Sequence, residues 1–320
     1  MNEQLEYAVE TLTANLSLSN LAKARDSLTT KYRNPLRHDK LSTFMETDLE
    51  RLSYLVTRMP ATYAVIDQIL NEVLIRNPHL QINSLLDLGS GPGTAYFAAV
   101  NIFEGCNKIS LIEQDGGLIK LGKSLESLCK LETTANWMQG DITNLPELST
   151  HDLVTISYAM NELKPEDRLE AITKGFNAAS KVLVIIEPGT KEGFAIIRQV
   201  RAELIALGAH PIAPCPHAMR CPMPENDWCH FSKRVSRTKA HRHLKEGTLG
   251  YEDEKFSYIA VSKSEVLLPD ARIIRHKDKH SGHMSLRLCT KEGELSSKTI
   301  SKRDGPLYKT ARKLDWGDSL

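Results

Sequence analysis

Long apolar runs are missing from this chain of 320 residues. A run such as Val182–Ile186 is far shorter than the roughly 20 residues that a membrane-spanning helix needs, so we expect no contact with a membrane. The first residues, MNEQLE, lack both a basic and then apolar signal peptide and an Arg-rich transit peptide. We therefore expect a protein of the bacterial cytoplasm.

A strong net charge is also absent, because 41 Lys and Arg stand against 40 Asp and Glu. This balance conceals an asymmetry. Residues 230–320 hold 20 basic and 12 acidic residues, a net charge of +8, which leaves −7 for residues 1–229. Near residue 240, several basic side chains follow one another with no acid between them, and this stretch is a candidate surface for a polyanion such as RNA. Its members are Lys233, Arg234, Arg237, Lys239, His241, Arg242, His243 and Lys245.

The apolar pattern changes near residue 80. Up to that point apolar residues recur at three- and four-residue spacing, which predicts helices that Pro60 and Pro78 interrupt or end. From residue 84, short apolar runs alternate with helical stretches, which predicts a doubly wound α/β sheet of parallel strands. The predicted strands are Ser84–Leu88, Lys108–Ile112, Trp137–Gln139, Leu153–Ser157 and Val182–Ile186.

The regular alternation ends near residue 210. The segment Pro211–His230 is too rich in proline for a helix, and we expect a loop there. Beyond it, Phe256–Val261 and Ser285–Leu288 read as strands, the first as an outer strand of the main sheet. We therefore divide the chain into an N-terminal helical region (1–80), a core (81–209) and a C-terminal region with the cysteine loop, outer strands and a basic end (210–320).

A glycine-rich turn follows the first predicted strand in the sequence DLGSGPGT, residues 87–94. Glycines at positions 89, 91 and 93 allow the backbone to approach a ligand closely, but they do not have the spacing of a dinucleotide fingerprint. Asp87 stands two residues before the first glycine, and Ser90 lies between the first two. This pattern resembles the first motif of the class I S-adenosylmethionine (SAM) methyltransferases, where the acid holds the methionine amine.

Further positions agree with that resemblance. Glu113 ends the second strand, where a carboxylate can accept both ribose hydroxyls. Asp141 follows the third strand, where this class contacts the adenine, and Ser157 ends the fourth. The set predicts a SAM site made by Asp87, Gly89, Ser90, Gly91, Gly93, Glu113, Asp141 and Ser157, because ligands in such sheets lie at the carboxyl ends of the strands.

A catalytic signature is missing. After the fourth strand the chain reads SYAMNEL, without the prolines of the motif for methylation of exocyclic amines. Cys106 and Cys129 are expected on helices beside the sheet, as buried small side chains rather than nucleophiles. Asn161 and Glu162 are weak candidates for orienting a substrate, and a structural role at a helix start competes with that reading.

Cys215, Cys221 and Cys229 cluster in the proline-rich loop, and Cys289 follows at a distance. Clustered thiols in a reducing compartment indicate metal binding. The long spacings and the prolines suit an iron–sulfur cluster. Zinc with His217 or His230 as additional ligands, and cysteines without any metal, stay open from spacing alone.

Taken together, several segments resemble the methyltransferase-like family of small-ribosomal-subunit proteins (Rsm-twenty-two, or methyltransferase-like protein seventeen). The resemblance runs from about residue 30 to the end. The segments are the cysteine region, Arg58–Tyr63, Ser157–Leu163, Glu187–Thr190 and the final stretch with Ser301–Gly305, Tyr308, Ala311–Lys313 and Trp316–Asp318.

The resemblance implies a class I SAM methyltransferase fold with an N-terminal helical extension and a C-terminal four-cysteine metal region. It implies that Cys215, Cys221, Cys229 and Cys289 hold a [4Fe-4S] cluster. We expect this cluster to be structural rather than redox-active, because the C-x3-C-x2-C spacing of radical-generating clusters is absent. It also implies rRNA and the small ribosomal subunit as partners, with no DNA expected. Two functions follow, an rRNA methyltransferase and a non-catalytic rRNA-binding assembly factor, and a methyltransferase of a protein or small molecule is a third.

Overall fold

The computed structural model describes residues 1–33, 45–145, 147–244 and 248–320, without the side chains of residues 239, 240 and 243. The chain forms two compact units, and each is described by itself. Unit 1 consists of Met1–Asn71, Gln81–Ser180 and Lys233–Glu254, and unit 2 of Glu72–Leu80, Lys181–Ser232 and Lys255–Leu320. Each unit combines three separate stretches of the chain, whereas the predicted regions 1–80, 81–209 and 210–320 are continuous. The three-part division stays a prediction.

The N-terminal region of unit 1 is helical, as the apolar spacing predicts. The third helix begins at a capping box, in which Thr47 accepts from the Glu50 amide and Glu50 bonds back to the cap backbone. Pro60 lies in the first turn of the next helix, where its missing N–H costs nothing. The helices are α1 (Glu3–Thr13), α2 (Leu18–Arg33), α3 (Asp48–Thr57) and α4 (Met59–Arg76).

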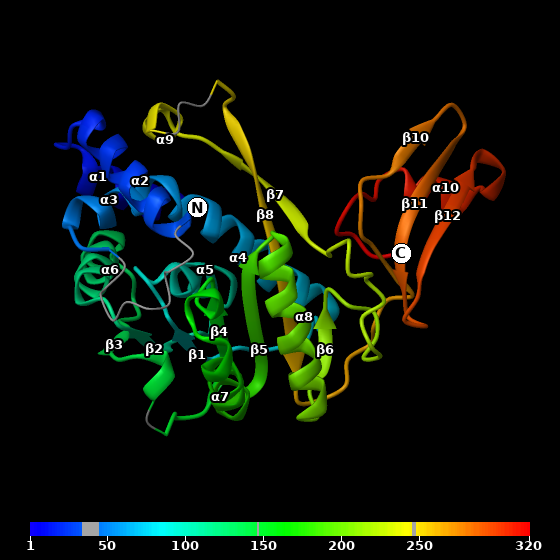
Figure 1. The fold of residues 1–320 in the computed structure, drawn as a ribbon, viewed down its shortest axis with the longest axis horizontal. Helices are drawn as coiled ribbons and strands as arrows, with labels where there is room; N and C mark the ends of the chain where they lie inside the picture. Colours follow the sequence, from blue (N-terminus) through cyan, green and yellow to red (C-terminus); the bar gives the residue numbers. More distant parts are fainter. Residues whose placement is uncertain (34–44, 146, 245–247) are drawn as a thin grey trace. The chain divides into compact units, whose positions relative to one another are not determined.

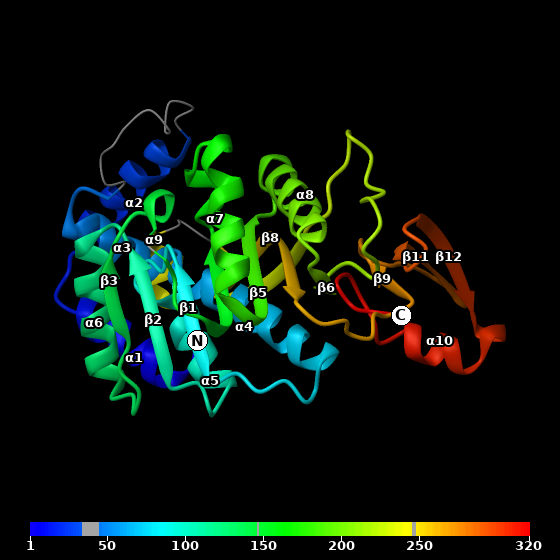
Figure 2. The ribbon, with the colours of Figure 1, turned by 90° about the horizontal axis from the view of Figure 1, so that it is seen from below.

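Parallel strands form the centre of unit 1, with β1 between β2 and β4. The register pairs Asp87 with Leu111 and with Thr155. Helix α7 lies on one face of these strands and α5 on the other, which confirms the doubly wound arrangement (Figures 1 and 2). The elements are β1 (Ser84–Leu88), α5 (Thr94–Ile102), β2 (Lys108–Glu113), α6 (Gly116–Cys129), β3 (Asn136–Gln139), η2 (Ile142–Asn144), β4 (His151–Ser157), η3 (Met160–Glu162) and α7 (Pro165–Ala178).

The sheet order is β3-β2-β1-β4-β5-β8-β6, and β7 also pairs with β8. The expected outer strand is β8, but it lies between β5 and β6, so the prediction of its place was wrong. The expected loop at Pro211–His230 begins with the short edge strand β6, which tolerates Pro211 because an edge leaves one row of amides unpaired. These elements are β5 (Ala179–Pro188), α8 (Lys191–Ala206), β6 (His210–Ala213), β7 (Phe231–Ser236), α9 (Lys239–Leu244) and β8 (Tyr251–Ser262).

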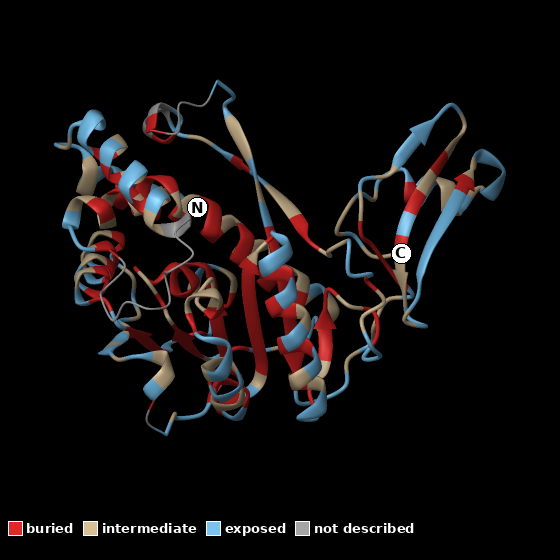
Figure 3. Ribbon diagram, viewed as in Figure 1, coloured by how far each residue is buried: buried red, intermediate tan, exposed pale blue. Residues whose placement is uncertain are grey.

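A second sheet of four strands belongs to unit 2, with β11 between β10 and β12 and with β9 also paired to β11. Met284, Leu286 and Leu288 alternate along β11 and pack under α10, so one face of this sheet is covered. Figure 3 shows this buried stripe and the exposed strands beside it. The elements are β9 (Ala271–Ile273), β10 (Asp278–His280), β11 (His283–Thr290), β12 (Leu295–Ser301), η4 (Lys302–Asp304) and α10 (Pro306–Ala311).

Helix length and hydropathy bear on membrane contact. Among the described residues, each helix is too short or too polar to cross a bilayer.

Candidate functional site

The glycine-rich turn connects β1 to α5 and folds against the end of β2. The amides of Gly89 and Ser90 both donate to the carbonyl of Ile112, at 2.9 and 3.0 Å. Gly89 has φ +72°, and a Cβ there would lie 2.8 Å from the Cβ of Ala159 in the turn after β4. Only glycine therefore fits, and the turn brings the carboxyl ends of β1, β2 and β4 together.

Asp87 lies at the centre of this edge and is only 1% exposed. Its carboxylate accepts a hydrogen bond of 2.6 Å from the Thr155 hydroxyl on β4. Burial and the nearby charge of Glu113 together raise the pKa of Asp87 to about 7, against the lowering effect of the Thr155 hydrogen bond. A buried carboxylate of this kind favours a cationic ligand, because the positive charge compensates the lost solvation.

Glu113 is buried at the end of β2. One carboxylate oxygen accepts from the Gly91 amide and the other from the Asp115 amide, both at 2.8 Å. Burial raises the pKa of Glu113, the two backbone bonds lower it, and the resulting pKa is about 7. Each oxygen keeps a second lone pair, so the carboxylate can still accept from a bound diol.

Two hydroxyl groups at this edge are buried and have no hydrogen-bond partner among the described residues. They belong to Ser90, in the glycine-rich turn, and Ser157, at the end of β4. A buried polar group without a partner costs about 1–3 kcal/mol, so native proteins rarely leave one without a reason. Both positions were predicted for cofactor contact, and a polar ligand would satisfy them.

Three other predicted residues have local partners. Asp141 is exposed and caps η2 by accepting from the Thr143 amide at 2.8 Å. The Asn161 amide donates to the Tyr158 carbonyl at 3.0 Å, within the turn after β4. Glu162 ends η3 and lies close enough to Glu113 to raise its pKa. Asn161 therefore has the structural use that competes with substrate contact.

Sequence reasoning missed the contribution of α3 to this edge. Arg51 donates from Nε to both oxygens of Asp115 at 3.0 Å, and Asp115 caps α6. Tyr54 lies one turn further along α3, where burial raises its pKa and the charges of Glu113 and Glu162 act on it. The Thr47-x-x-Glu50 pattern predicts the start of α3, but no local signal identifies the partner of Arg51, which is 64 residues away.

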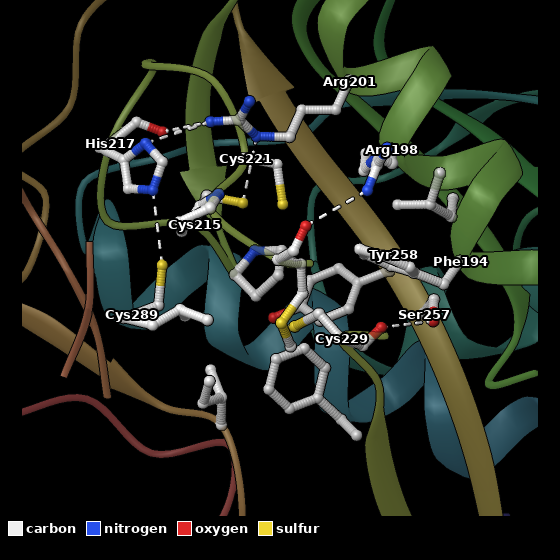
Figure 4. A pocket seen from close by; sticks show the side chains of 17 residues that line it. Phe194, Arg198, Arg201, Cys215, His217, Cys221, Cys229, Ser257, Tyr258 and Cys289 are labelled. Carbon is white, nitrogen blue, oxygen red and sulfur yellow. Dashed lines mark hydrogen bonds between the residues drawn. The ribbon is translucent and has the colours of Figure 1, made fainter. Parts of the chain in front are cut away.

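The four predicted cysteines lie around one pocket of unit 2 (Figure 4). Cys215, Cys221 and Cys229 come from the loop after β6, and Cys289 comes from β11. No three His, Cys, Asp or Glu side chains of the described residues are placed to hold a single metal ion. The sequence prediction that these four residues gather is confirmed, whereas metal binding stays a prediction.

Basic and imidazole groups surround the thiols. The buried Arg201, from α8, donates to the Cys215 sulfur at 3.2 Å and to the His217 carbonyl at 2.7 Å. The Nε2 atom of His217 lies 3.4 Å from the Cys289 sulfur. Burial raises the pKa of Cys289 to about 12 and that of Cys229 well above its ordinary value. Without a ligand the Cys229 and Cys289 thiols are protonated, and the Arg201 guanidinium can compensate the charge of a thiolate.

The cysteine loop between β6 and β7 has no regular secondary structure, so side chains must satisfy its carbonyls. Arg272 donates to Pro214 at 2.9 Å, Arg198 to Met223 at 3.3 Å and Ser257 to Cys229 at 2.8 Å. The Trp228 indole donates in turn to the Gly189 carbonyl at 3.0 Å. The loop is thus held in one shape from several elements of unit 2.

The other two cysteines are buried in unit 1, as expected. Cys129 ends α6, but Cys106 lies in the turn between α5 and β2 rather than on a helix. For Cys106 the expected burial is therefore confirmed, and the expected place on a helix was wrong.

Two arginines of the basic stretch near residue 240 pair with carboxylates of β8. Arg234 forms two bonds of 2.8 and 2.9 Å with Asp253, and Arg237 bonds to Glu252 at 3.0 Å. The buried His241 also lies 3.2 Å from Glu252. Lys245 and the side chains of Lys239 and His243 lie outside what the structure describes. As a free polyanion surface this stretch is weaker than the sequence suggests.

The sheet order and the edge around Asp87 define the class of protein. Strands ordered β3-β2-β1-β4-β5 are typical of doubly wound nucleotide-binding sheets. Strand β8 lies between β5 and β6 and is antiparallel to both, and an antiparallel strand inserted at this place is characteristic of class I SAM methyltransferases. Residues 48–320 match the family model described as mitochondrial small ribosomal subunit Rsm22. The chain therefore belongs to this family, as the sequence resemblance predicted.

Relatives in the curated collections are similar over most of this chain. It is 28% identical to the mitochondrial Rsm22-cox11 tandem proteins 1 and 2 of Schizosaccharomyces pombe, over 87% of its own length and 44% of theirs. It is 26% identical to the mitochondrial ribosome assembly protein METTL17 of Homo sapiens, over 84% of its length and 62% of the relative's. The chain thus spans about half the length of these relatives.

Solved structures resemble the chain only distantly. Magnesium protoporphyrin IX methyltransferase of Synechocystis with bound SAM is 12% identical, with a TM-score of 0.43, over 78% of this chain and all of that one. A SAM-dependent methyltransferase of Aquifex aeolicus is 13% identical, with a TM-score of 0.42, over 68% of this chain and 99% of that one. The fold class rests on the sheet order rather than on these likenesses.

Proposed function

We propose that the chain binds SAM at the edge formed by the carboxyl ends of β1, β2 and β4. Asp87 would face the methionine amine, Glu113 the ribose hydroxyls and Asp141 the adenine. The glycine-rich turn leaves room for the ligand backbone, and the free hydroxyls of Ser90 and Ser157 would gain partners. Support comes from the two buried carboxylates, whose raised pKa values favour a positively charged ligand.

We also propose that Cys215, Cys221, Cys229 and Cys289 hold a [4Fe-4S] cluster. The four thiols line one pocket, and the long spacings between them and the neighbouring prolines suit an iron–sulfur cluster. Arg201 and His217 supply donors for sulfur, and the thiols must lose their protons when a metal binds. The cluster would join the cysteine loop to β11, and so stabilise unit 2.

The biological role that we propose is assembly of the small ribosomal subunit through contact with its rRNA. The relatives are named for the small ribosomal subunit and for ribosome assembly. The observation that carries the proposal is that the family match covers both the SAM edge and the cysteine pocket, since it runs from residue 48 to residue 320. The chain spans about half the length of these relatives, so the proposed role concerns the part that they share.

Methyl transfer to rRNA is the first candidate activity, and non-catalytic binding is the second. Non-catalytic binding is favoured by the turn after β4. The side-chain amide of Asn161, a candidate for orienting a substrate, already donates to the Tyr158 carbonyl there. In an enzyme, the residues of this edge would position the methyl donor against an acceptor atom of the RNA. In an assembly factor, the same residues would hold SAM as a structural ligand.

Metal analysis tests the cluster. After anaerobic purification we expect about four irons and four sulfides per chain, with a broad visible absorption. Cys221→Ser should lose most of this iron, whereas Cys129→Ser, which removes a buried thiol of unit 1, should retain it. One zinc per chain, or equal iron in both variants, would contradict the proposal.

Incubation with methyl-labelled SAM tests the activity. Transfer of label to small-subunit rRNA, lost in Asp87→Asn, would identify an RNA methyltransferase. SAM binding in calorimetry without any transfer would favour the assembly factor. Failure to bind SAM at all would refute both assignments of the β1–β2–β4 edge.

A further inference from the structure

The four-stranded sheet of unit 2 has one covered and one open face. Met284, Leu286, Leu288 and Ile300 point to the covered side, where they pack with α10. Neighbouring residues of β11 must point the other way, because side chains alternate along a strand. Cross-strand pairing then assigns the open face to Asp278, His280, His283, Ser285, Arg287, Cys289, Leu295, Ser297, Thr299 and Ser301.

Most of this open face consists of hydrogen-bonding groups, and Leu295 is an exposed apolar side chain at the end where Cys289 lies. Ser285 and Thr299 hydroxyls lie 3.2 Å apart, and Arg287 donates to the Ser297 hydroxyl at 3.3 Å. At the outer end, the rings of His280 and His283 stack at 4.7 Å with an interplanar angle of 12°. Protein interfaces usually have an apolar centre, so this surface suits a polar partner better.

The charge around the open face is positive and available. Residues 276–303 contain seven Lys and Arg and three Asp and Glu. Lys277 binds carbonyls of the C-terminal segment and Lys291 pairs with Asp270. The remaining five form no ion pair with any residue that the structure describes. Lys279 and Lys298 pair with Met284 and Leu286 and so share the covered face, which leaves Arg287, Lys302 and Arg303 for the open face.

The basic stretch near residue 240 differs in this respect. Arg234 and Arg237 are held by carboxylates of β8, so a phosphate would have to displace Asp253 or Glu252. Displacing an existing partner offsets much of the gain from a new ion pair. The cations beside the open face carry no such cost, and Lys302 and Arg303 directly follow β12.

We propose that the open face, flanked by Lys302 and Arg303, is the surface through which the protein binds single-stranded RNA. This inference rests on the proposed rRNA role and names the contact for it. Phosphates would lie along Arg287, Lys302 and Arg303, and the serine and threonine hydroxyls would bond to phosphate and ribose oxygens. The stacked imidazoles offer a flat surface for a base, and open sheet faces bind splayed single strands in this way.

Salt-dependent RNA affinity tests the proposal. The probe is a short fluorescent single-stranded RNA of mixed sequence, titrated with the full chain purified anaerobically. A single phosphate contact contributes about −0.7 to the slope of log affinity against log salt, which corresponds to about fivefold at about 0.1 M salt. We expect this loss for Arg287→Gln, and about a hundredfold loss with a slope smaller by about 2 for Arg287→Gln, Lys302→Gln and Arg303→Gln together.

The matched control is Arg234→Gln, which removes the same charge from an exposed but ion-paired site. It should leave affinity and slope unchanged, and all variants should melt like the wild type.

Unchanged binding in the triple variant would overturn the proposal, as would an equal loss in Arg234→Gln. Retained RNA binding with loss of a ribosomal protein partner would overturn it in favour of a protein surface. A wild type that binds no RNA would refute the RNA role itself, which distinguishes the two failures.

Discussion

Arg272 offers the sharpest test of how unit 2 is held together. Its side chain is 3% exposed and makes three charge-assisted contacts. It donates to the Pro214 carbonyl of the cysteine loop at 2.9 Å, to the Gly317 carbonyl at 2.6 Å and to the Glu72 carboxylate at 2.7 Å. One residue of β9 therefore connects α4, the cysteine loop and the C-terminal segment.

Arg272→Met keeps most of the side-chain volume and removes all three bonds. Two carbonyls lose this donor, at about 1–3 kcal/mol for each that stays buried and unpaired. Glu72 keeps Arg76 as a partner at 2.9 Å, so its carboxylate is not left alone. We expect the free energy of unfolding of unit 2 to fall by about 2–6 kcal/mol, the sum for the two carbonyls.

Tryptophan fluorescence during urea unfolding measures this loss. Trp228 and Trp316 belong to unit 2 and Trp137 to unit 1, so a Trp137→Phe background reports unit 2 alone. The control Lys291→Met removes an exposed pair with Asp270 and should leave the midpoint unchanged. A loss below about 1 kcal/mol for Arg272→Met would refute the reasoning, because it would mean that water or other donors replace the arginine.

Two further predictions concern the SAM edge. Because burial holds the pKa values of Asp87 and Glu113 at about 7, both become charged as pH rises through that value, and calorimetry should find SAM affinity increasing by about tenfold per group from pH 6 to pH 8. A SAM affinity that does not change with pH would contradict this assignment. The same raised pKa values mean that the stability of unit 1 without ligand falls as pH rises toward 7. Gly89→Ala should abolish SAM binding and cost about 1–2 kcal/mol from its φ of +72° alone, plus the overlap with Ala159. Gly208→Ala, also at positive φ but with open space around it, should show only the backbone cost in thermal melting and keep full SAM affinity.

Strongly apolar strands could be predicted from the sequence almost to the residue. The expected strand Ser84–Leu88 is β1 without change, and Lys108–Ile112 is β2 less one residue. By contrast, β12 reads LSSKTIS and exposes five of its seven residues, so it has no apolar signal. Its pairing with β11 makes it a strand, and such tertiary contacts are not visible in a local pattern.

Charge patterns were predicted less well than motifs. Arg234 and Arg237 stand in a stretch without acids, but β8 brings Asp253 and Glu252 beside them. The gathering of four cysteines followed from residue type and family resemblance. Arg272 could not be predicted as their support, because its partner Glu72 is 200 residues away in the sequence.

The composition of unit 2 has a consequence for the order of synthesis. The unit joins Glu72–Leu80 to Lys181–Ser232 and Lys255–Leu320, and the amides of Ala271 and Ile273 donate to the carbonyls of Leu320 and Asp318. During translation the parallel strands of unit 1 can pair while later segments are still inside the ribosome. The bonds that hold β9 to the C-terminus cannot form until residues 318–320 have emerged. Any metal bound after that step would be acquired by a chain whose SAM edge has already left the ribosome.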